Sequence, residues 1–186
     1  TVSSEDIPVI TTTSLPAGRV GTAYSQTLAA TSVTAVTWSI ASGSLPDGLS
    51  LTGNTISGTP TTMGSFTFTV KATNTGGDAT QELTIVINQK PEITTGSLAT
   101  GKVGAAYSQK LEATGNTPIT WTIESGNLPA GLTLTGDTIS GTPTAAGTFN
   151  ITLKASNDYG TATKAYTLTV SSEDIPVITT TSLPAG

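Results

Sequence analysis

The sequence predicts an all-β fold made of two antiparallel β-sandwiches in tandem. Threonine fills 41 of the 186 positions, glycine 20 and proline 10, a composition that favours strands and turns over helices. No window repeats apolar residues at helical spacing, whereas several alternate apolar and hydroxyl side chains with the period of a strand. Sliding the chain by 83 positions matches Tyr24 to Tyr107, Trp38 to Trp121 and Pro60 to Pro143. The folding unit is therefore a module that occurs twice.

The two ends of the chain carry a longer-range repeat. Residues Thr1 to Gly18 recur unchanged as Thr169 to Gly186. We therefore expect the chain to be a segment of a longer array. The predicted organisation is a linker over residues 1–7, a first module over 8–88, a second over 89–173, and the first strand of a third repeat over 174–186.

The first half of module 1 contains two strand signals around a turn. Val36–Ile40 alternates apolar and hydroxyl residues, which predicts a strand whose tryptophan, Trp38, faces the core. Leu45–Leu51 places proline and then glycine where a turn needs them, and Thr55–Pro60 predicts a short strand that proline ends. The second module repeats these signals at 119–123, 128–134 and 138–143.

The second half of module 1 predicts a closing hairpin. Phe66–Ala72 alternates so that Lys71 points outward, Asn74–Gly77 is a turn, and Ala79–Ile87 is another alternating strand. Lys154 is the matching outward lysine of module 2. About seven short strands with one core tryptophan predict a two-sheet sandwich.

Two long motif runs carry a resemblance to a known family. LPDGLSLTGNTISGTPTTMGSFTFTVKATNTGGDAT (Leu45 to Thr80) and LPAGLTLTGDTISGTPTAAGTFNITLKASNDYGTAT (Leu128 to Thr163) follow VGTAYSQTLAAT and VGAAYSQKLEAT. They resemble the putative-Ig repeats of large bacterial surface proteins, related to dystroglycan-type cadherin-like domains. The resemblance implies tandem Ig-like sandwiches in extracellular adhesins, surface-layer proteins and appendages of secreted hydrolases, without a catalytic residue. The family often has an acid before the ISGTP strand, where module 1 has Asn54 and module 2 has Asp137.

The composition argues against several classes of function. Cysteine and histidine are both absent, which removes disulfides, thiol chemistry and the usual general base of an enzyme. No segment reaches the ~20 apolar residues of a membrane span. The basic residues are scattered, so nucleic acid is not an expected partner. They are Arg19, Lys71, Lys90, Lys102, Lys110, Lys154 and Lys164.

The acidic junction before each odd-numbered module is the candidate binding site. It contains Glu5 and Asp6, repeated as Glu173 and Asp174. If the chain enters a sandwich at one end and leaves at the other, the last hairpin turn returns to the first end and brings Asp78 toward this pair. Three carboxylates with turn carbonyls could hold Ca²⁺, the one cofactor that the sequence suggests. The alternative is that the acids solvate a linker.

Two further hypotheses compete with purely structural interpretations. Trp38, Trp121, Tyr24 and Tyr107 could form a carbohydrate platform, but the alternation favours core positions, with Ile40 and Ile123 in phase with the tryptophans. Lys71 and Lys154 could form Lys–Asn isopeptide bonds, but their outward phase argues against this. The many threonines suit the wet faces of strands without glycosylation or ice binding.

The sequence therefore favours a mechanical role at the cell surface. The predicted function is a spacer of an extracellular bacterial surface protein that presents a distal domain and contacts neighbouring repeats of its own chain. The alternative is an adhesion module that binds a cell-surface carbohydrate or protein through polar loops. These loops are 32–35, 74–77, 115–118 and 157–160. The segment 175–186 could also add to a sheet edge of a neighbouring molecule, giving head-to-tail association.

Overall fold

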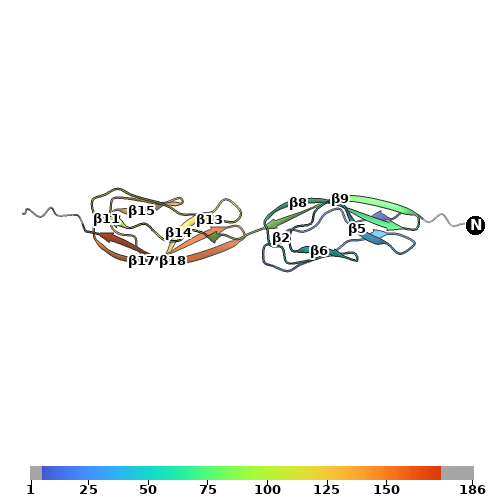
Figure 1. Cartoon of the computed structure of the whole chain (residues 1–186), viewed down its shortest axis with the longest axis horizontal. Coiled ribbons are helices and arrows are strands. Elements are labelled where there is room, and N and C mark those ends of the chain that lie inside the picture. The colour runs from blue at the N-terminus through green and yellow to red at the C-terminus, as the bar shows by residue number, and fades with distance from the viewer. Residues whose placement is uncertain (1–5, 173–186) are drawn as a thin grey trace, which may run out of the picture. The chain divides into compact units, whose positions relative to one another are not determined.

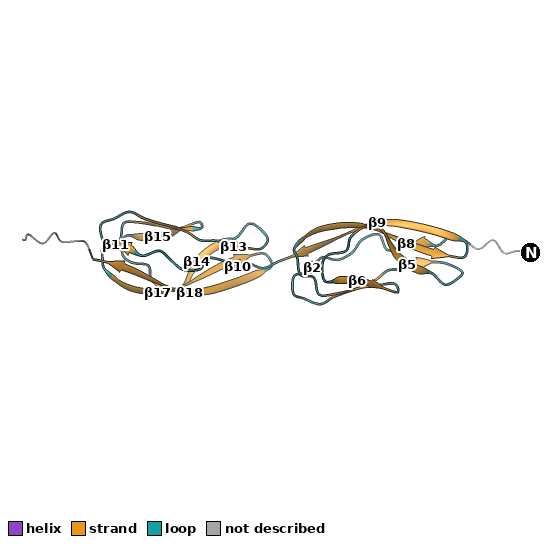
Figure 2. Cartoon of the chain, viewed as in Figure 1, coloured by secondary structure: helices purple, strands orange, loops and turns teal. Residues whose placement is uncertain are grey.

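The structure, a computed structural model, describes residues 6–172. The regular secondary structure of these residues consists of β-strands. Within the same range, no helix is long and apolar enough to cross a membrane. The chain divides into two compact units with the boundary between Lys90 and Pro91, called module 1 and module 2 below (Figure 1). Each unit is a β-sandwich of the Ig-like type, which confirms the predicted fold class (Figure 2).

Module 1 has a four-stranded sheet facing a three-stranded one. The first has the order β2-β9-β8-β5 and the second the order β3-β7-β6, while the short strands β1 and β4 form a separate pair. The strands are β1 (Val9–Ile10), β2 (Gly18–Arg19), β3 (Tyr24–Thr27), β4 (Ala30–Thr31), β5 (Thr37–Gly43), β6 (Leu49–Thr52), β7 (Thr55–Gly58), β8 (Gly64–Asn74) and β9 (Gly77–Asn88).

Module 2 repeats this topology strand for strand. Its sheets have the orders β11-β18-β17-β14 and β12-β16-β15, with β10 paired to β13. The strands are β10 (Glu92–Ile93), β11 (Gly101–Lys102), β12 (Tyr107–Lys110), β13 (Ala113–Thr114), β14 (Thr120–Gly126), β15 (Leu132–Thr135), β16 (Thr138–Gly141), β17 (Gly147–Asn157) and β18 (Gly160–Ser171).

The beginning of each module runs from the separate two-stranded pair to the four-stranded sheet. In module 1, β1 pairs antiparallel with β4, and β2 then pairs parallel with the end of β9, where Gly18 is opposite Ile87. The Tyr24 hydroxyl donates to the carbonyl of Pro16 at 3.0 Å and so fixes the segment between β1 and β2. Burial raises the pKa of this tyrosine. Tyr107 makes the same 3.0 Å bond to Ala99 in module 2.

The two hydrophobic cores differ in which of two neighbouring strands carries a buried aromatic ring. In module 1, Phe68 on β8 is opposite Leu83 on β9, and both are buried. At the matching positions of module 2, Ile151 is opposite Tyr166, also buried. A large and a smaller side chain thus fill the same cross-strand pair in both modules, which keeps the packed volume similar. The Tyr166 hydroxyl is satisfied by the carbonyl of Thr95 at 2.8 Å.

The tryptophans pack against the cores but remain half-buried. Trp38 and Ile40 lie against the core of module 1, as the alternation predicts, and Trp121 lies against that of module 2. Ile123 is opposite the buried Leu153 and so lies on the inner face, as the alternation predicts, but the residue is 37% exposed. The register of β14 against β17 shifts directly after Ile123, as the register of β5 against β8 does after Ile40.

The LPxGL and ISGTP motifs meet through two glycines. Gly48 has a φ of 88°, and a Cβ on it would lie 2.0 Å from the carbonyl oxygen of Thr59. The amide of Thr59 donates to the carbonyl of Gly48 at 3.0 Å, so the two backbones touch. A Cβ on Gly58 would likewise lie 2.0 Å from the Gly48 oxygen. The motif therefore encodes a backbone contact that only glycine allows.

Candidate functional site

The N-terminal pole of module 1 is the end of this sandwich at which the chain arrives. It consists of the arriving segment Asp6–Ile7, the loop Ser32–Val33 and the hairpin turn Asn74–Gly77, which joins β8 to β9. The turn lies here because β9 begins at Gly77 and pairs with β2 only at its far end. The predicted return of the hairpin to the arriving chain is thus present, since a Cβ on Gly77 would lie 3.2 Å from Ile7 Cγ1.

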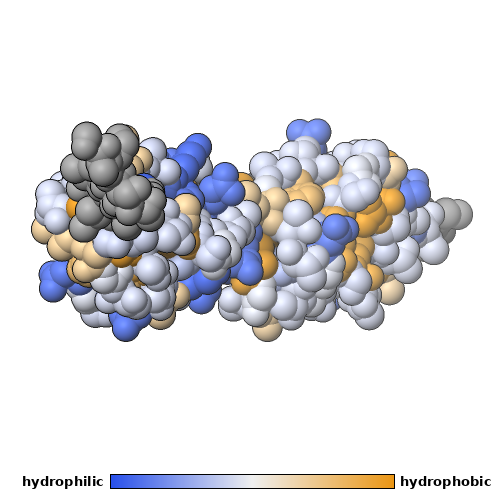
Figure 3. Space-filling view, turned by 60° about the vertical axis from the view of Figure 1, so that its left-hand side comes forward, coloured by the Kyte–Doolittle hydropathy of each residue, from blue (hydrophilic) through white to orange (hydrophobic). Residues whose placement is uncertain are grey.

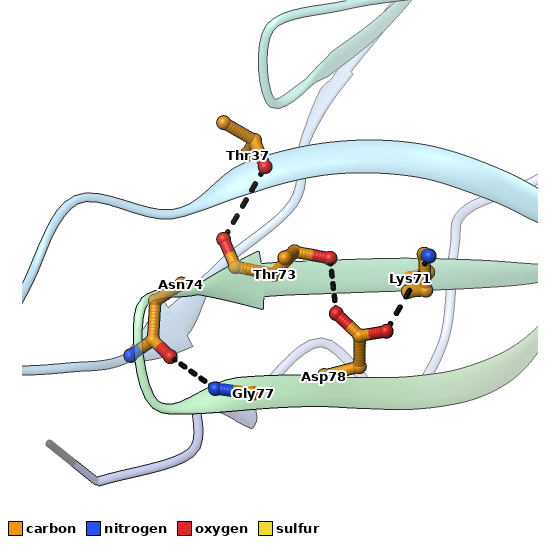
Figure 4. A network of polar contacts seen from close by, with 6 residues as sticks. All are labelled: Thr37, Lys71, Thr73, Asn74, Gly77 and Asp78. Carbon is orange, nitrogen blue, oxygen red and sulfur yellow. Dashed lines mark hydrogen bonds and ion pairs between the residues drawn. The ribbon is translucent and has the colours of Figure 1, made fainter.

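Asn74 connects the three segments of this pole. Its side-chain oxygen accepts the amide protons of Gly76 and Gly77 at 2.8 and 3.0 Å, which closes the turn (Figure 4). Its side-chain nitrogen donates to the Asp6 carbonyl at 2.8 Å and to the Ser32 hydroxyl at 2.9 Å. One amide side chain therefore fixes the turn, the arriving chain and the neighbouring loop together.

Asp78 is held by its own hairpin. Its carboxylate accepts a hydrogen bond from the Thr73 hydroxyl at 2.6 Å, and Lys71 Nζ lies 3.5 Å from its other oxygen (Figure 4). The Thr73 hydrogen bond, followed by the positive charge of Lys71, lowers the pKa of Asp78 below its ordinary value of 3.8. The carboxylate is therefore ionised at neutral pH and has a cation within reach.

The structure places only part of the predicted calcium site. Asp6 and Asp78 both lie at the N-terminal pole, but Asp6 contributes its backbone carbonyl to Asn74, and Asp78 contacts Lys71. Among residues 6–172, no three acidic, histidine or cysteine side chains come together in a group that could hold a metal ion. Glu5, Glu173 and Asp174 fall outside the described residues. The calcium site therefore stays a prediction.

At the matching pole of module 2, Asn157 stands in the place of Asn74. Asn157 donates to the carbonyl of Asn116 at 2.8 Å and accepts the Tyr159 amide at 2.9 Å. Thr161 stands where module 1 has Asp78. Lys154 instead pairs with Glu124 at 2.9 Å, across the neighbouring strands β17 and β14. The pair of Asp78 and Lys71 is therefore particular to module 1, whereas the acid of the module 2 hairpin, Asp158, lies in the turn itself.

A shallow concavity beside the tryptophan occurs in both modules. In module 1 it has a volume of about 750 Å³ and is lined by Leu28, Trp38 and Asn54, among others. In module 2 the lining includes Leu111, Trp121 and Asp137, around about 490 Å³. Both concavities are open to solvent and are lined by polar and apolar residues. Tyr24 and Tyr107 do not join them, because both rings are buried.

Two features of the N-terminal pole do not follow from the sequence pattern. The pattern identifies Asn74 as a turn residue, but its bonds to Asp6 and Ser32 join positions far apart in the chain. Exposed apolar residues also gather at this pole, with Val33 the most exposed of them at 70%. A comparison of the two modules reveals that Val33 is not needed for the fold, because the matching position in module 2 is the polar residue Asn116.

The comparisons with known proteins agree with this architecture. A staphylococcal protein, the serine-rich adhesin for platelets of Staphylococcus aureus, is 36% identical over 127 residues, which cover 64% of this chain. The chain spans only 6% of the length of that adhesin. The insect immune protein hemolin superposes with a TM-score of 0.58 at 15% identity, over 93% of this chain and 48% of hemolin.

An I-band fragment of titin gives a TM-score of 0.51 at 14% identity, over 89% of this chain and 66% of the fragment. At this level of identity, titin and hemolin show the fold alone. The sequence profile of the family described as Putative Ig domain matches residues 7–88 and again residues 90–171. The resemblance predicted from the LPxGL and ISGTP motifs is thereby confirmed: the chain belongs to the Putative Ig domain family and contains two of its repeats.

Proposed function

We propose that this chain is a spacer segment of a repetitive extracellular bacterial surface protein that presents a distal domain. The observation that carries the proposal is the path of the chain through each module. Module 1 receives the chain beside Asn74 and releases it at Asn88, where the Asn88 carbonyl accepts the Val20 amide at 2.9 Å. Asn88 ends β9, whose first residue, Gly77, lies at the receiving pole. The chain thus leaves at the opposite end from its arrival.

This path suits a module that adds length. β9 has 12 residues, which span about 40 Å at the usual rise of ~3.3 Å per residue. A sandwich that receives and releases its chain at opposite poles adds most of this length to an array. In module 2 the same release occurs at Ser171, whose carbonyl accepts the Val103 amide at 3.0 Å.

The surface location rests on the family and on the adhesin similarity. The related staphylococcal protein is named as an adhesin for platelets, and its length far exceeds that of the matched region. The absence of cysteine is consistent with a sandwich that is stabilised by packing alone. Figure 3 shows a face of mostly intermediate hydropathy, with hydrophilic and hydrophobic side chains among the intermediate ones.

Surface display tests the spacer function directly. Chains with two, four and six modules, each with the same epitope at the far end, would be anchored on encapsulated bacteria. We expect antibody access to the epitope to rise with module number at equal expression. A scrambled order of the same modules should work equally well. Access that does not depend on module number would contradict the proposal.

The repeated tryptophan concavity favours carbohydrate binding as a second candidate function. An indole ring beside polar groups such as Asn54 offers the stacking face and hydrogen-bonding groups that a sugar uses. A glycan array, followed by NMR titration of the Trp38 and Trp121 indole signals, tests it. Binding that shifts both indoles would support this function, and unshifted signals at millimolar sugar would contradict it.

Association through the repeated segment 175–186 is a separate proposal. This segment is identical to 7–18, which supplies β1 and the first residue of β2 in module 1. A copy from another molecule could therefore compete for the same sheet edges. Removal of 175–186 should abolish concentration-dependent association in sedimentation experiments, and association that persists would contradict strand addition.

A further inference from the structure

An exposed apolar patch covers the N-terminal pole of module 1. Its three members are Ile7, Val9 and Val33, with exposures of 54, 61 and 70%. They line one concavity of about 780 Å³ together with Asp6 and the hairpin turn at Gly76. Exposed apolar side chains gathered in one concave area are typical of a docking surface.

Module 2 has no such patch at the matching pole. The residues that correspond to Ile7, Val9 and Val33 are Lys90, Glu92 and Asn116. Lys90 and Glu92 are exposed. The difference between the two modules is therefore a change of chemistry on a shared fold. The apolar patch is not a general requirement of this sandwich, since module 2 folds without it.

The order of the repeats indicates what faces this patch in the array. The segment after module 2, Ile175–Gly186, is identical to Ile7–Gly18 at the start of module 1. In the proposed array, a module of the first type therefore follows a module of the second type. The surface that arrives at the apolar patch is then the C-terminal pole of a second-type module, the end at which the chain leaves it.

That C-terminal pole is formed by two adjoining loops with small apolar side chains. The amide of Gly104 donates to the carbonyl of Pro143 at 3.0 Å and brings the loops together. Exposed alanines occupy both loops, at positions 105, 106, 145 and 146. In module 1 the corresponding positions carry Thr22, Ala23, Thr62 and Met63. The second-type pole therefore presents four small alanine side chains, whereas the first-type pole presents Met63, which is 40% exposed.

We propose that the apolar patch of module 1 is the docking surface for the C-terminal pole of a preceding second-type module, forming a packed joint at that step of the array. This inference rests on the proposed array. The linker would not produce such a joint by itself, because the linker after a second-type module is two residues longer than the linker after module 1. The former runs from Val170 to Ile175 and the latter from Ile87 to Lys90. A longer linker alone gives a looser joint.

A tandem chain tests the joint with native sequence throughout. Residues 1–168 are followed by residues 1–186, and the repeat of 1–18 at 169–186 makes the connection identical to the natural one. The chain has no cysteine, so two spin labels can be placed at will, at Thr133→Cys in the first copy and Ser50→Cys in the second. Both positions are exposed and lie on strands.

The expected result is a narrow label-to-label distance distribution in electron paramagnetic resonance. Ile7→Lys, Val9→Glu and Val33→Asn in the second copy, the residues that module 2 carries, should broaden it at least about twofold, because small polar contacts between domains permit motion. Ala106→Glu with Ala145→Glu in the first copy should broaden it as well. Thr22→Ala in the second copy is the control and should leave it unchanged.

Two results would overturn the packed joint. They are a broad distribution in the unaltered chain, and a distribution whose width neither set of substitutions changes. The substituted side chains are all exposed, and unfolding curves would show whether each variant is folded. If the triple variant of the apolar patch does not fold, the double variant Ala106→Glu with Ala145→Glu still tests the joint. If the array is long in small-angle scattering but the distance distribution is broad, only this inference is overturned. A compact array overturns the spacer function.

Discussion

The side-chain amide of Asn74 donates to the backbone carbonyl of Asp6 at 2.8 Å and so ties the arriving chain to the last hairpin of module 1. Because the same side chain also closes its turn, Asn74→Ala should lower the free energy of unfolding of module 1 by about 1–3 kcal/mol. Thr75→Ala in the exposed part of the turn is the control. Urea unfolding and hydrogen exchange of the turn amides would measure the effect. Equal stability of the two variants would contradict the clamp.

The lowered pKa of Asp78 predicts a pH effect of defined sign. Because the folded pKa is below the ordinary value of 3.8, the ionised carboxylate stabilises module 1 above that pH. This contribution is lost as the pH falls through the lowered pKa. Thr73→Val removes the hydrogen bond that contributes most and should return the pKa toward 3.8, as NMR titration of Asp78 would show. An unchanged pKa in this variant would assign the shift to another cause.

The backbone contact at Gly48 predicts a large difference between two glycines of module 1. Gly48→Ala places a Cβ 2.0 Å from the Thr59 oxygen and should cost several kcal/mol or prevent folding. Gly53 also has a positive φ, of 58°, but a Cβ added there would meet open space, with no atom beyond its chain neighbours within 4 Å. Gly53→Ala should therefore cost only about 1 kcal/mol, from backbone conformation alone. Similar thermal unfolding of the two variants would refute this account of the motif.

The exchanged aromatic ring predicts coupling between Phe68 and Leu83. Phe68→Ile leaves a cavity, and Leu83→Tyr overfills the same region, so each alone should cost about 1–3 kcal/mol. The double variant reproduces the pair Ile151 and Tyr166 of module 2 and should recover about 0.5–3 kcal/mol of the summed loss. Chemical denaturation of all four chains gives this coupling energy. Strict additivity would show that the two positions do not share volume.

The predicted calcium site gives a test that depends on one carboxylate. If Glu5, Asp6 and Asp78 bind Ca²⁺, millimolar calcium should raise the unfolding temperature by mass action, and Asp78→Asn should abolish the rise. Lys71→Ala removes the competing ammonium group 3.5 Å from Asp78 and should enlarge it. Magnesium at the same ionic strength is the control. An unfolding temperature that calcium does not change would end the hypothesis.

Much of the fold could be predicted because its signals are local. The alternation in Phe66–Ala72 and Ala79–Ile87 marks the central parts of β8 and β9, and the outward phase of Lys71 agrees with its exposed ion pair. The register shifts directly after Ile40 and Ile123 do not follow from the alternation. A bulge depends on the partner strand, so a pattern within one strand does not reveal it.

The site was less predictable because its contacts are long-range. The bonds from Asn74 to Asp6 and Ser32 join residues 68 and 42 positions apart. The parallel pairing of β2 with β9 involves only two residues of each strand, too few to leave a periodic signal. The apolar patch becomes visible in the sequence only when the two modules are compared position by position at the offset of 83, because each residue alone resembles an ordinary strand residue.

Small-angle X-ray scattering of chains with two, four and six modules tests the central claim most directly. The tandem connection at the repeated segment 1–18 gives each longer chain native sequence at every junction. A spacer requires the maximum dimension to grow in proportion to module number, by about 40 Å per module from the rise of β9. A dimension that grows only with the cube root of module number, as in a compact cluster of sandwiches, would contradict the account.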